Sequence, residues 1–174
     1  MLKLRGTQDK FVDTAVDIIM SPSTKKCVMV APVAYGKSIC IANTVMRLDA
    51  PSIILQPNKE LLEQNFKKYI GYGYKASICS QSLKLYQKNK RPYTEIDGVP
   101  YLCDEISDVT FATSGSIKSM VEQVKAMKVK YLIIDECHLN TKTASVIRDF
   151  IAATKIRNVL GVTATPIVLA NSFD

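Results

Sequence analysis

Metal-binding and disulfide-forming residues are scarce in this sequence. It has one histidine, His138, and its five cysteines never form a C-x-x-C pair. A tetrahedral zinc site takes its four ligands from such closely spaced residues, so no zinc is expected. An odd number of scattered thiols is typical of a reduced, intracellular protein in which cysteines pack as small core residues.

Long apolar runs are absent as well. Every apolar run is far shorter than the ~20 residues that a membrane-spanning helix needs. Asp9, Asp13 and Asp17 interrupt the first twenty residues, which excludes the apolar region of a signal peptide. We therefore expect a cytoplasmic protein with no membrane partner. A nucleoid-associated protein and a phage-encoded protein are both compatible with this expectation.

The overall composition is that of an ordinary globular domain. The 174 residues are 47% apolar and 22% charged, without repeats or low-complexity tracts, which excludes a disordered tail, collagen and a coiled coil. One domain over residues 1–174 is expected. The net charge of +7 favours an anionic partner such as nucleic acid or a nucleotide, although solubility alone would also explain it.

Short apolar runs that do not alternate with polar residues predict buried strands. They occupy residues 27–31, 52–56, 108–112, 131–134 and 158–162. Segments with helical periodicity separate them, and Asn58 and Ser116 are placed to cap two of these helices. This alternation predicts an α/β fold, with a mostly parallel central sheet and helices on both faces. Residues 80–104 have no clear periodicity and are expected to form a long surface loop.

A phosphate-binding loop pattern follows the first predicted strand. Residues 31–38 read APVAYGKS and precede a helical segment, as this motif requires, although Ala31 replaces the first glycine. Gly36 lets the backbone approach phosphate oxygens, Lys37 is expected to reach the β- and γ-phosphates, and Ser38 is expected to ligate magnesium. The predicted nucleotide-binding residues are Pro32, Val33, Ala34, Tyr35, Gly36, Lys37 and Ser38. A chance strand, loop and helix with this spacing is the alternative.

An acidic pair stands at the end of the strongest predicted strand, 131–134. Asp135 and Glu136 lie where open α/β sheets place their ligands, and His138 follows them. Asp135 is expected to hold magnesium, Glu136 to orient or deprotonate the water that attacks the γ-phosphate, and His138 to couple the site to the rest of the domain. A helix cap or a solvated turn would also explain such a pair. With the lysine of the loop, it predicts that ATP and Mg²⁺ are gripped between neighbouring strand ends.

Six short segments carry a family resemblance. They are LRGTQ at 4–8, APVAYGKS at 31–38, ILQPNKEL at 54–61, DVTFATSGSI at 108–117, DECH at 135–138 and GVTATP at 161–166. In this order they are similar to the first RecA-like domain of a superfamily 2 helicase or translocase with a DECH box, in the style of phage and bacterial DNA-repair helicases. The resemblance extends nearly from end to end. It implies a RecA-like P-loop NTPase domain that uses ATP and Mg²⁺ and acts on nucleic acid, on DNA rather than RNA.

The resemblance also implies roles outside the nucleotide loop. Gln8 would read the adenine edge, with Arg5 nearby, because an amide can both donate and accept a hydrogen bond. Thr163 and Thr165 would couple the ATP site to the bound strand. The implied strand-contacting residues are Pro57, Asn58, Thr113, Ser114, Gly115 and Ser116. An exposed glutamine at a helix start, plain helix caps and a polar turn are the structural alternatives to these three roles.

Several features depart from the family pattern. Val33, Ala34 and Tyr35 replace small residues in the loop, and Gln56 replaces an apolar or small residue. The chain ends eight residues after Pro166, before the second RecA-like domain, whose arginine finger can contribute ~10³ to 10⁵ in rate. We expect a fragment of a longer helicase, or a module that acts with a separate partner. The chain alone is expected to bind nucleotide weakly and to hydrolyse it negligibly.

Two functions of other classes stay open. A P-loop switch or kinase would also use the glycine-lysine-serine loop with Mg²⁺, but such proteins do not usually have a TATP-like element after a DECH box. A non-catalytic nucleic-acid-binding module with a decayed ATP site would need only the basic surface. Intact Lys37, Asp135 and Glu136 disfavour that reading.

Overall fold

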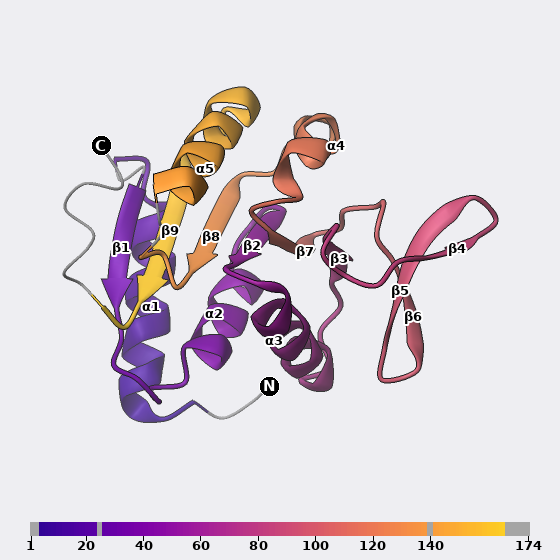
Figure 1. Cartoon of the computed structure of the whole chain (residues 1–174). Helices are drawn as coiled ribbons and strands as arrows, with labels where there is room; N and C mark the ends of the chain where they lie inside the picture. Colours follow the sequence, from indigo (N-terminus) through magenta and orange to yellow (C-terminus); the bar gives the residue numbers. More distant parts are fainter. Residues whose placement is uncertain (1–3, 24–25, 139–140, 166–174) are drawn as a thin grey trace.

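A six-stranded parallel sheet forms the centre of the protein, in the order β1-β9-β8-β2-β7-β3 (Figure 1). The computed structural model describes residues 4–23, 26–138 and 141–165. The strands are β1 (Lys26–Val30), β2 (Ser52–Gln56), β3 (Ser77–Cys79), β7 (Val109–Thr113), β8 (Tyr131–Asp135) and β9 (Asn158–Thr163). All five predicted strands are confirmed to within one residue, and β3 is an addition.

The strands are mostly apolar because both faces of the sheet are covered. Along β2, Ile53 and Leu55 pack into one core cluster, whereas Ile54 packs into the other. Successive side chains of a strand point to opposite faces, so each face has its own core. The predicted mostly parallel sheet with helices on both faces is therefore confirmed.

Three helices cover each face of the sheet (Figure 1). The first face carries α1 (Gly6–Met20), α2 (Lys37–Met46) and α3 (Lys59–Gly71). The second carries the short 3₁₀ helix η1 (Ile117–Met120), α4 (Val121–Ala126) and α5 (Thr141–Thr154). Within the described ranges, no helix is long and apolar enough to cross a membrane.

The two predicted helix caps have different outcomes. Asn58 caps α3 as expected, because its Oδ1 accepts a hydrogen bond from the Leu61 N–H at 2.9 Å. Ser116 does stand at the N-cap position of a helical segment, η1, but its side chain makes no capping hydrogen bond. Its hydroxyl instead accepts a hydrogen bond from the Gln81 N–H at 2.8 Å, and the segment after it begins as a 3₁₀ turn.

The predicted loop at 80–104 contains a second, antiparallel sheet, which corrects the sequence-based expectation. Its strands are β4 (Tyr86–Lys88), β5 (Arg91–Ile96) and β6 (Val99–Leu102), which form an arm that projects beside β3 (Figure 1). Two-residue turns join them, at residues 89–90 and 97–98, and all four turn residues have positive φ. Such turns match the twist of a hairpin. Ile96 and Tyr101 anchor the arm to the first core cluster, where Tyr101 meets the Phe66 ring edge-on at 4.9 Å.

The parallel sheet places the sequence motifs along one edge. Parallel strands share a direction, so the segments that follow β1, β9, β8, β2 and β7 all leave at the carboxyl edge. In that order these segments are the phosphate-binding loop, Thr163–Thr165, the acidic pair, Pro57–Asn58 and residues 113–116. Pro166, the last residue of the GVTATP segment, lies outside the described residues.

Candidate functional site

The phosphate-binding loop runs from β1 into the first turn of α2. Gly36 has a φ of +90° and precedes the helix, and its carbonyl accepts hydrogen bonds from the Ile39 and Cys40 N–H groups. A Cβ on Gly36 would lie 2.6 Å from Gln8 Nε2, so any other residue would be strained at this φ and would displace the Gln8 amide. The first N–H groups of a helix lack acceptors within it, so this turn presents donors to an anion.

The lysine of this loop meets the acidic pair. Lys37 Nζ lies 3.0 Å from Glu136 Oε1, and both side chains are mostly covered, with 14% and 25% exposed. The expectation of neighbouring strand ends needs one correction, because β9 lies between β1 and β8. The two side chains reach across the end of β9, so residues about a hundred positions apart in sequence form one site.

Asp135 lies deeper than Glu136, with 4% of its surface exposed. Its Oδ1 accepts a hydrogen bond from the Glu136 N–H at 3.0 Å, and its Oδ2 accepts one from Asn65 Nδ2 at 3.2 Å. Burial raises the pKa of Asp135 to about 6, and the negative charge of Glu136 acts in the same direction. Two carboxylates facing one lysine leave unbalanced negative charge. Together with the Ser38 hydroxyl nearby, these oxygen donors fit a magnesium ion.

Asn65 of α3 connects the predicted magnesium ligands, and the sequence reasoning missed it. Ser38 Oγ donates to Asn65 Oδ1 at 2.8 Å, and Asn65 Nδ2 donates to Gln56 Oε1 at 2.9 Å as well as to Asp135. Gln56 also hydrogen-bonds to Asp135, which lowers the pKa of that carboxyl. A metal-bound hydroxyl can keep donating its proton to an outer acceptor, so Asn65 is placed to orient Ser38 as a ligand.

Replacing Asn65 by leucine is expected to weaken Mg²⁺ binding to the ATP-bound chain by about 10- to 100-fold. Leucine has a similar volume but can hold neither Ser38 nor Asp135. ATP titrations at several Mg²⁺ concentrations measure this effect, and ATP affinity without Mg²⁺ should change much less. Asn43→Leu is the matched control, since Asn43 is equally buried but donates to Ile39 O within α2. Equal losses in both variants would contradict the expected role.

Asp135 is expected to make stability depend on pH. An ordinary aspartate has a pKa near ~4, so between about pH 4 and pH 6 the folded chain keeps a proton that the unfolded chain has released. Stability from this group therefore falls as the pH rises through that window. The Asp135→Asn variant has no titrating group at this position. The difference between its free energy of unfolding and that of the wild type should therefore increase by about 2–3 kcal/mol, in favour of the variant, between pH 4 and pH 7. Urea unfolding without nucleotide or Mg²⁺ tests this, and parallel pH profiles would contradict it.

The start of α1 is tied to the phosphate-binding loop. Gln8 is buried, and its Nε2 donates to Tyr35 O at 2.7 Å while its Oε1 accepts from the Arg5 N–H at 2.9 Å. The Tyr35 hydroxyl donates to Thr7 O, and its ring packs against Phe11 at 5.7 Å. Gln8 thus holds the loop through protein contacts, and adenine recognition by Gln8 and Arg5 stays a prediction.

The histidine and threonines expected to couple the site lie together beside Glu136. His138 Nδ1 lies 2.9 Å from Thr163 Oγ1 and 3.4 Å from Glu136 Oε2. Thr163 Oγ1 also accepts a hydrogen bond from the Thr165 N–H at 3.1 Å. A chain of contacts therefore leads from the acidic pair through His138 to the segment after β9.

Two adjoining pockets lie along the carboxyl edge and share Lys37, Leu61 and Glu136. The larger, of about 570 Å³, is lined by Val33, Lys37, Pro57, Asn58, Leu61, Glu136, His138, Thr143, Ala164 and Thr165. The smaller, of about 220 Å³, is lined by Ala34, Gly36, Lys37, Ser38, Leu61, Gln64, Asn65, Lys68, Asp135 and Glu136. The structure thus brings together residues from the loop, the acidic pair, the Pro57–Asn58 turn and the segment after β9. Gln64 and Lys68, on α3, were not expected from the sequence.

The second predicted strand-contacting loop is partly occupied by contacts within the protein. Thr113 and Ser116 are buried, and Thr113 Oγ1 lies 3.0 Å from Ser80 Oγ. The exposed part of this loop is Gly115, with Ser114 half-buried. If a nucleic-acid strand lies here, these two residues are the ones that it can reach.

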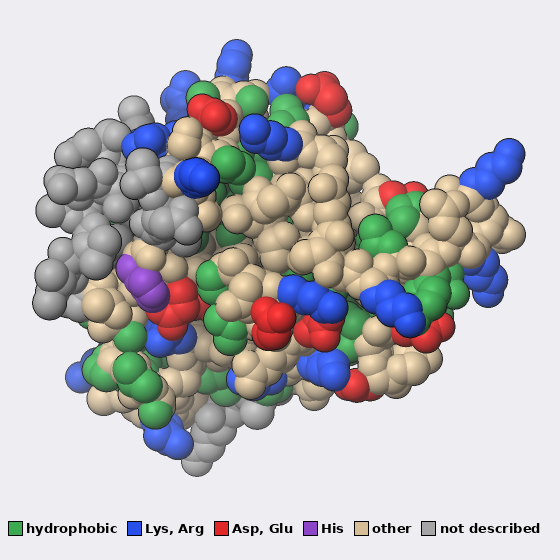
Figure 2. Space-filling model, viewed as in Figure 1, with side chains coloured by type: hydrophobic (Ala, Val, Ile, Leu, Met, Phe, Trp, Pro, Cys, Tyr) green, Lys and Arg blue, Asp and Glu red, His purple; other side chains and the backbone are tan. Residues whose placement is uncertain are grey.

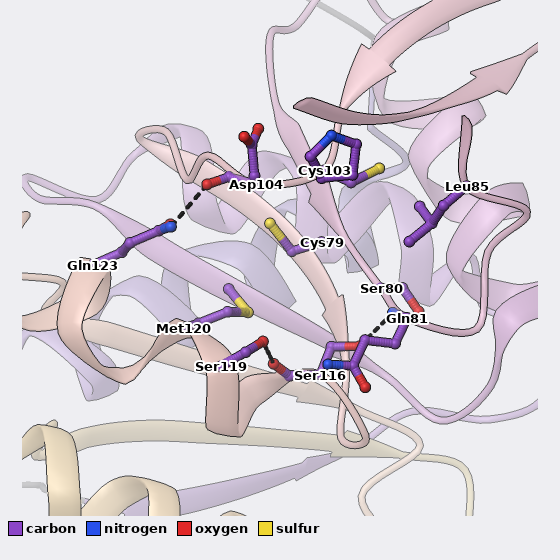
Figure 3. Close-up of a pocket in the computed structure, with 11 residues that line it drawn as sticks. Cys79, Ser80, Gln81, Leu85, Cys103, Asp104, Ser116, Ser119, Met120 and Gln123 are labelled. Atoms are coloured by element: carbon purple, nitrogen blue, oxygen red, sulfur yellow. Dashed lines mark hydrogen bonds between the residues drawn. The ribbon is translucent and has the colours of Figure 1, made fainter. Parts of the chain in front are cut away.

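A third pocket, of about 260 Å³, separates this loop and the η1–α4 segment from the 80–104 arm (Figure 3). Ser116, Ser119 and Met120 lie on one side, whereas Leu85 and Cys103 lie on the other. All five cysteines are free, and burial raises the pKa of each thiol, so they remain neutral.

Comparisons with known proteins bear on the fold and the family. A family model described as DEAD/DEAH box helicase matches residues 9–172. No curated protein matches the chain by sequence. Among solved structures, a nuclease-deletion mutant of the Type ISP restriction-modification enzyme LlaGI with a DNA substrate mimic has 17% identity and a TM-score of 0.63, covering 95% of this chain and 18% of that one.

Two further solved structures share this fold. The UvsW helicase from bacteriophage T4 has 16% identity and a TM-score of 0.59, covering 94% of this chain and 53% of that one. The Sulfolobus solfataricus SWI2/SNF2 ATPase core in complex with dsDNA has 14% identity and a TM-score of 0.60, covering 95% and 33%. The chain therefore spans between about a fifth and about half of these proteins, and the predicted fold class is confirmed.

Proposed function

We propose that this chain, which belongs to the DEAD/DEAH box helicase family, is the ATP-binding half of a nucleic-acid-dependent ATPase that moves along or unwinds DNA. The contact between Lys37 and Glu136, at 3.0 Å, supports this proposal most directly. In this contact, the lysine that we propose to bind phosphate meets the carboxylate that we propose to act in catalysis. A decayed ATP site would not need this pairing to persist.

Each residue of the site has a definable part in ATP hydrolysis. Lys37 exchanges Glu136 for the β- and γ-phosphates, because a triphosphate carries more negative charge than one carboxylate. Glu136, released from Lys37, orients or deprotonates the attacking water. Ser38 and Asp135 are the residues that would hold magnesium, which neutralises charge on the phosphates when bound. Through their contacts, His138 and Thr163 then transmit the release of Glu136 from Lys37 to the segment after β9.

A second RecA-like domain, in cis or in trans, is proposed to close the larger pocket. Val33 lines this pocket and is 83% exposed, the largest exposed fraction among the large apolar side chains on the surface of the described residues. A partner domain that covers Val33 would also exclude water and supply the arginine that stabilises the transferring phosphoryl group. The 174-residue chain alone is therefore expected to bind ATP weakly and to hydrolyse it negligibly.

DNA is the proposed nucleic acid, and the DECH box together with the DVTFATSGSI segment is the sequence basis for placing the chain near phage and bacterial repair helicases. Two proteins of similar fold were solved with a DNA substrate mimic and with dsDNA. The strand is proposed to lie across Pro57, Asn58, the half-buried Ser114 and the exposed Gly115, held through phosphate contacts.

The test is ATP hydrolysis by the chain joined to its second domain, measured with and without DNA or RNA of matched sequence. We expect DNA to stimulate hydrolysis strongly and RNA to stimulate it less. Equal rates with and without nucleic acid would favour a P-loop switch or kinase. Nucleic-acid binding that is unaffected by ATP would favour a non-catalytic binding module.

A further inference from the structure

The β4-β5-β6 arm is fastened to the proposed DNA-contacting loop. Just before β4, the Gln81 N–H donates to Ser116 Oγ at 2.8 Å, and Ser80 Oγ lies 3.0 Å from Thr113 Oγ1. β3, which leads into the arm, is also the edge strand next to β7. The arm therefore extends the carboxyl edge beyond the last proposed DNA contact, on the side away from the ATP site (Figure 1).

The arm is held rigid by contacts among its own side chains. Tyr86 and Tyr93 are directly opposite in the β4–β5 ladder, so they share a face, and their rings stack at 5.4 Å. Lys84 Nζ lies over the Tyr86 ring, 5.0 Å from its centroid. Arg91 donates two hydrogen bonds to Asp104, at 2.9 and 2.8 Å. Each tyrosine therefore has one ring face occupied by the other, and Tyr86 is also in contact with Lys84.

Lysines without a carboxylate partner among the described residues gather around the first hairpin of the arm, two at or beside its turn and one just before β4. Three exposed lysines, Lys84, Lys88 and Lys90, form no ion pair with any carboxylate in the described part of the chain. Two of the four acidic charges in residues 84–105 are balanced by ion pairs, since Asp97 pairs with Lys67, and Asp104 and Glu105 share the single charge of Arg91. Of the acids in residues 84–105, Glu95 alone is outside these pairs. Figure 2 shows Lys and Arg side chains along the projecting arm.

We propose that the β4–β5 hairpin is a clamp for duplex nucleic acid that binds its phosphate backbone through Lys84, Lys88 and Lys90. This inference rests on the proposed function and adds the form of the substrate. Single-strand sites combine positive charge with free aromatic faces on which bases stack, and here the rings of Tyr86 and Tyr93 are engaged with each other. A duplex presents one phosphate charge per about 1.7 Å of its axis, so it suits three ammonium groups on a rigid projection.

The test compares the wild-type chain with Lys84→Ala/Lys88→Ala/Lys90→Ala. Fluorescence anisotropy with a labelled 20-base-pair DNA duplex and with one of its strands gives the affinity of each at several salt concentrations. Loss of three phosphate contacts should lower duplex affinity at least about tenfold and reduce the slope of log affinity against log salt by about 2–3. Single-strand affinity should fall less than threefold.

The control is Lys26→Ala/Lys128→Ala/Lys155→Ala, which removes the same charge from exposed lysines at the opposite, amino edge of the sheet. It should keep the wild-type slope. The inference is overturned if the arm variant keeps its duplex slope, if the control loses as much, or if single-strand binding falls as far as duplex binding. A wild-type chain that binds neither DNA would instead overturn the proposed function, and the inference with it.

Discussion

Replacing Glu136 by glutamine is expected to lower the rate of ATP hydrolysis by about 10²- to 10⁴-fold while ATP affinity is kept or raised. Glutamine has the shape of glutamate but cannot accept a proton from water. It also frees Lys37 from its ion pair, at 3.0 Å, so that lysine meets the triphosphate without first losing a partner. Hydrolysis is measured on the chain together with the proposed second RecA-like domain and saturating DNA, and ATP affinity on the chain alone.

Glu122→Gln is the matched control for this variant. Glu122 forms an exposed ion pair with Lys125 in α4, so the same chemical change is made outside the two pockets that Lys37 lines. Its hydrolysis rate should equal that of the wild type. A Glu136→Gln variant that loses affinity and rate in equal measure would contradict a catalytic role for Glu136, since it would show a binding or folding defect instead.

Replacing Lys37 by alanine is expected to weaken ATP binding by about 10- to 100-fold. A hydrogen bond between charged groups contributes roughly 1.5–3 kcal/mol, and removing Lys37 also leaves Glu136 without its counter-charge beside the phosphates. Isothermal titration with ATP and Mg²⁺ measures the loss. Adding Glu136→Gln to Lys37→Ala should recover part of it, because the repulsion is then removed.

Lys67→Ala is the control here, because Lys67 also forms an ion pair on the same side of the protein, with Asp97, but lies outside both pockets. Its ATP affinity should match that of the wild type. If Lys37→Ala bound ATP as tightly as Lys67→Ala, the loop would not be a phosphate site.

The central sheet and the edge that carries the site could be predicted because their signals are local. Short apolar runs in the sequence indicate buried parallel strands, and an asparagine such as Asn58 just before a helical segment indicates a helix cap. Parallel direction then brings every strand end to one edge, whatever the strand order. Order itself depends on pairing between distant segments, which is why the insertion of β9 between β1 and β8 did not follow from the sequence.

The missed features have weaker or ambiguous signals. The arm strands are three to six residues long and carry charges, so they form no apolar run, although Asp97-Gly98 is a recognised hairpin turn. Asn65 lies among Leu62, Phe66 and Tyr69 on the buried side of α3, and a polar residue within an apolar stripe was the available sign of a buried contact. Its partners, which come from three other elements, could be known only from the structure.

ATP titrations of the wild type and Asp135→Asn, each with and without Mg²⁺, test most directly whether the phosphate-binding loop and the acidic pair form one site. We expect Mg²⁺ to raise the ATP affinity of the wild type at least about tenfold and to have almost no effect on the variant, while their affinities without Mg²⁺ stay within a few-fold of each other. An equal gain from Mg²⁺ in both proteins would contradict a shared site for the metal and the triphosphate.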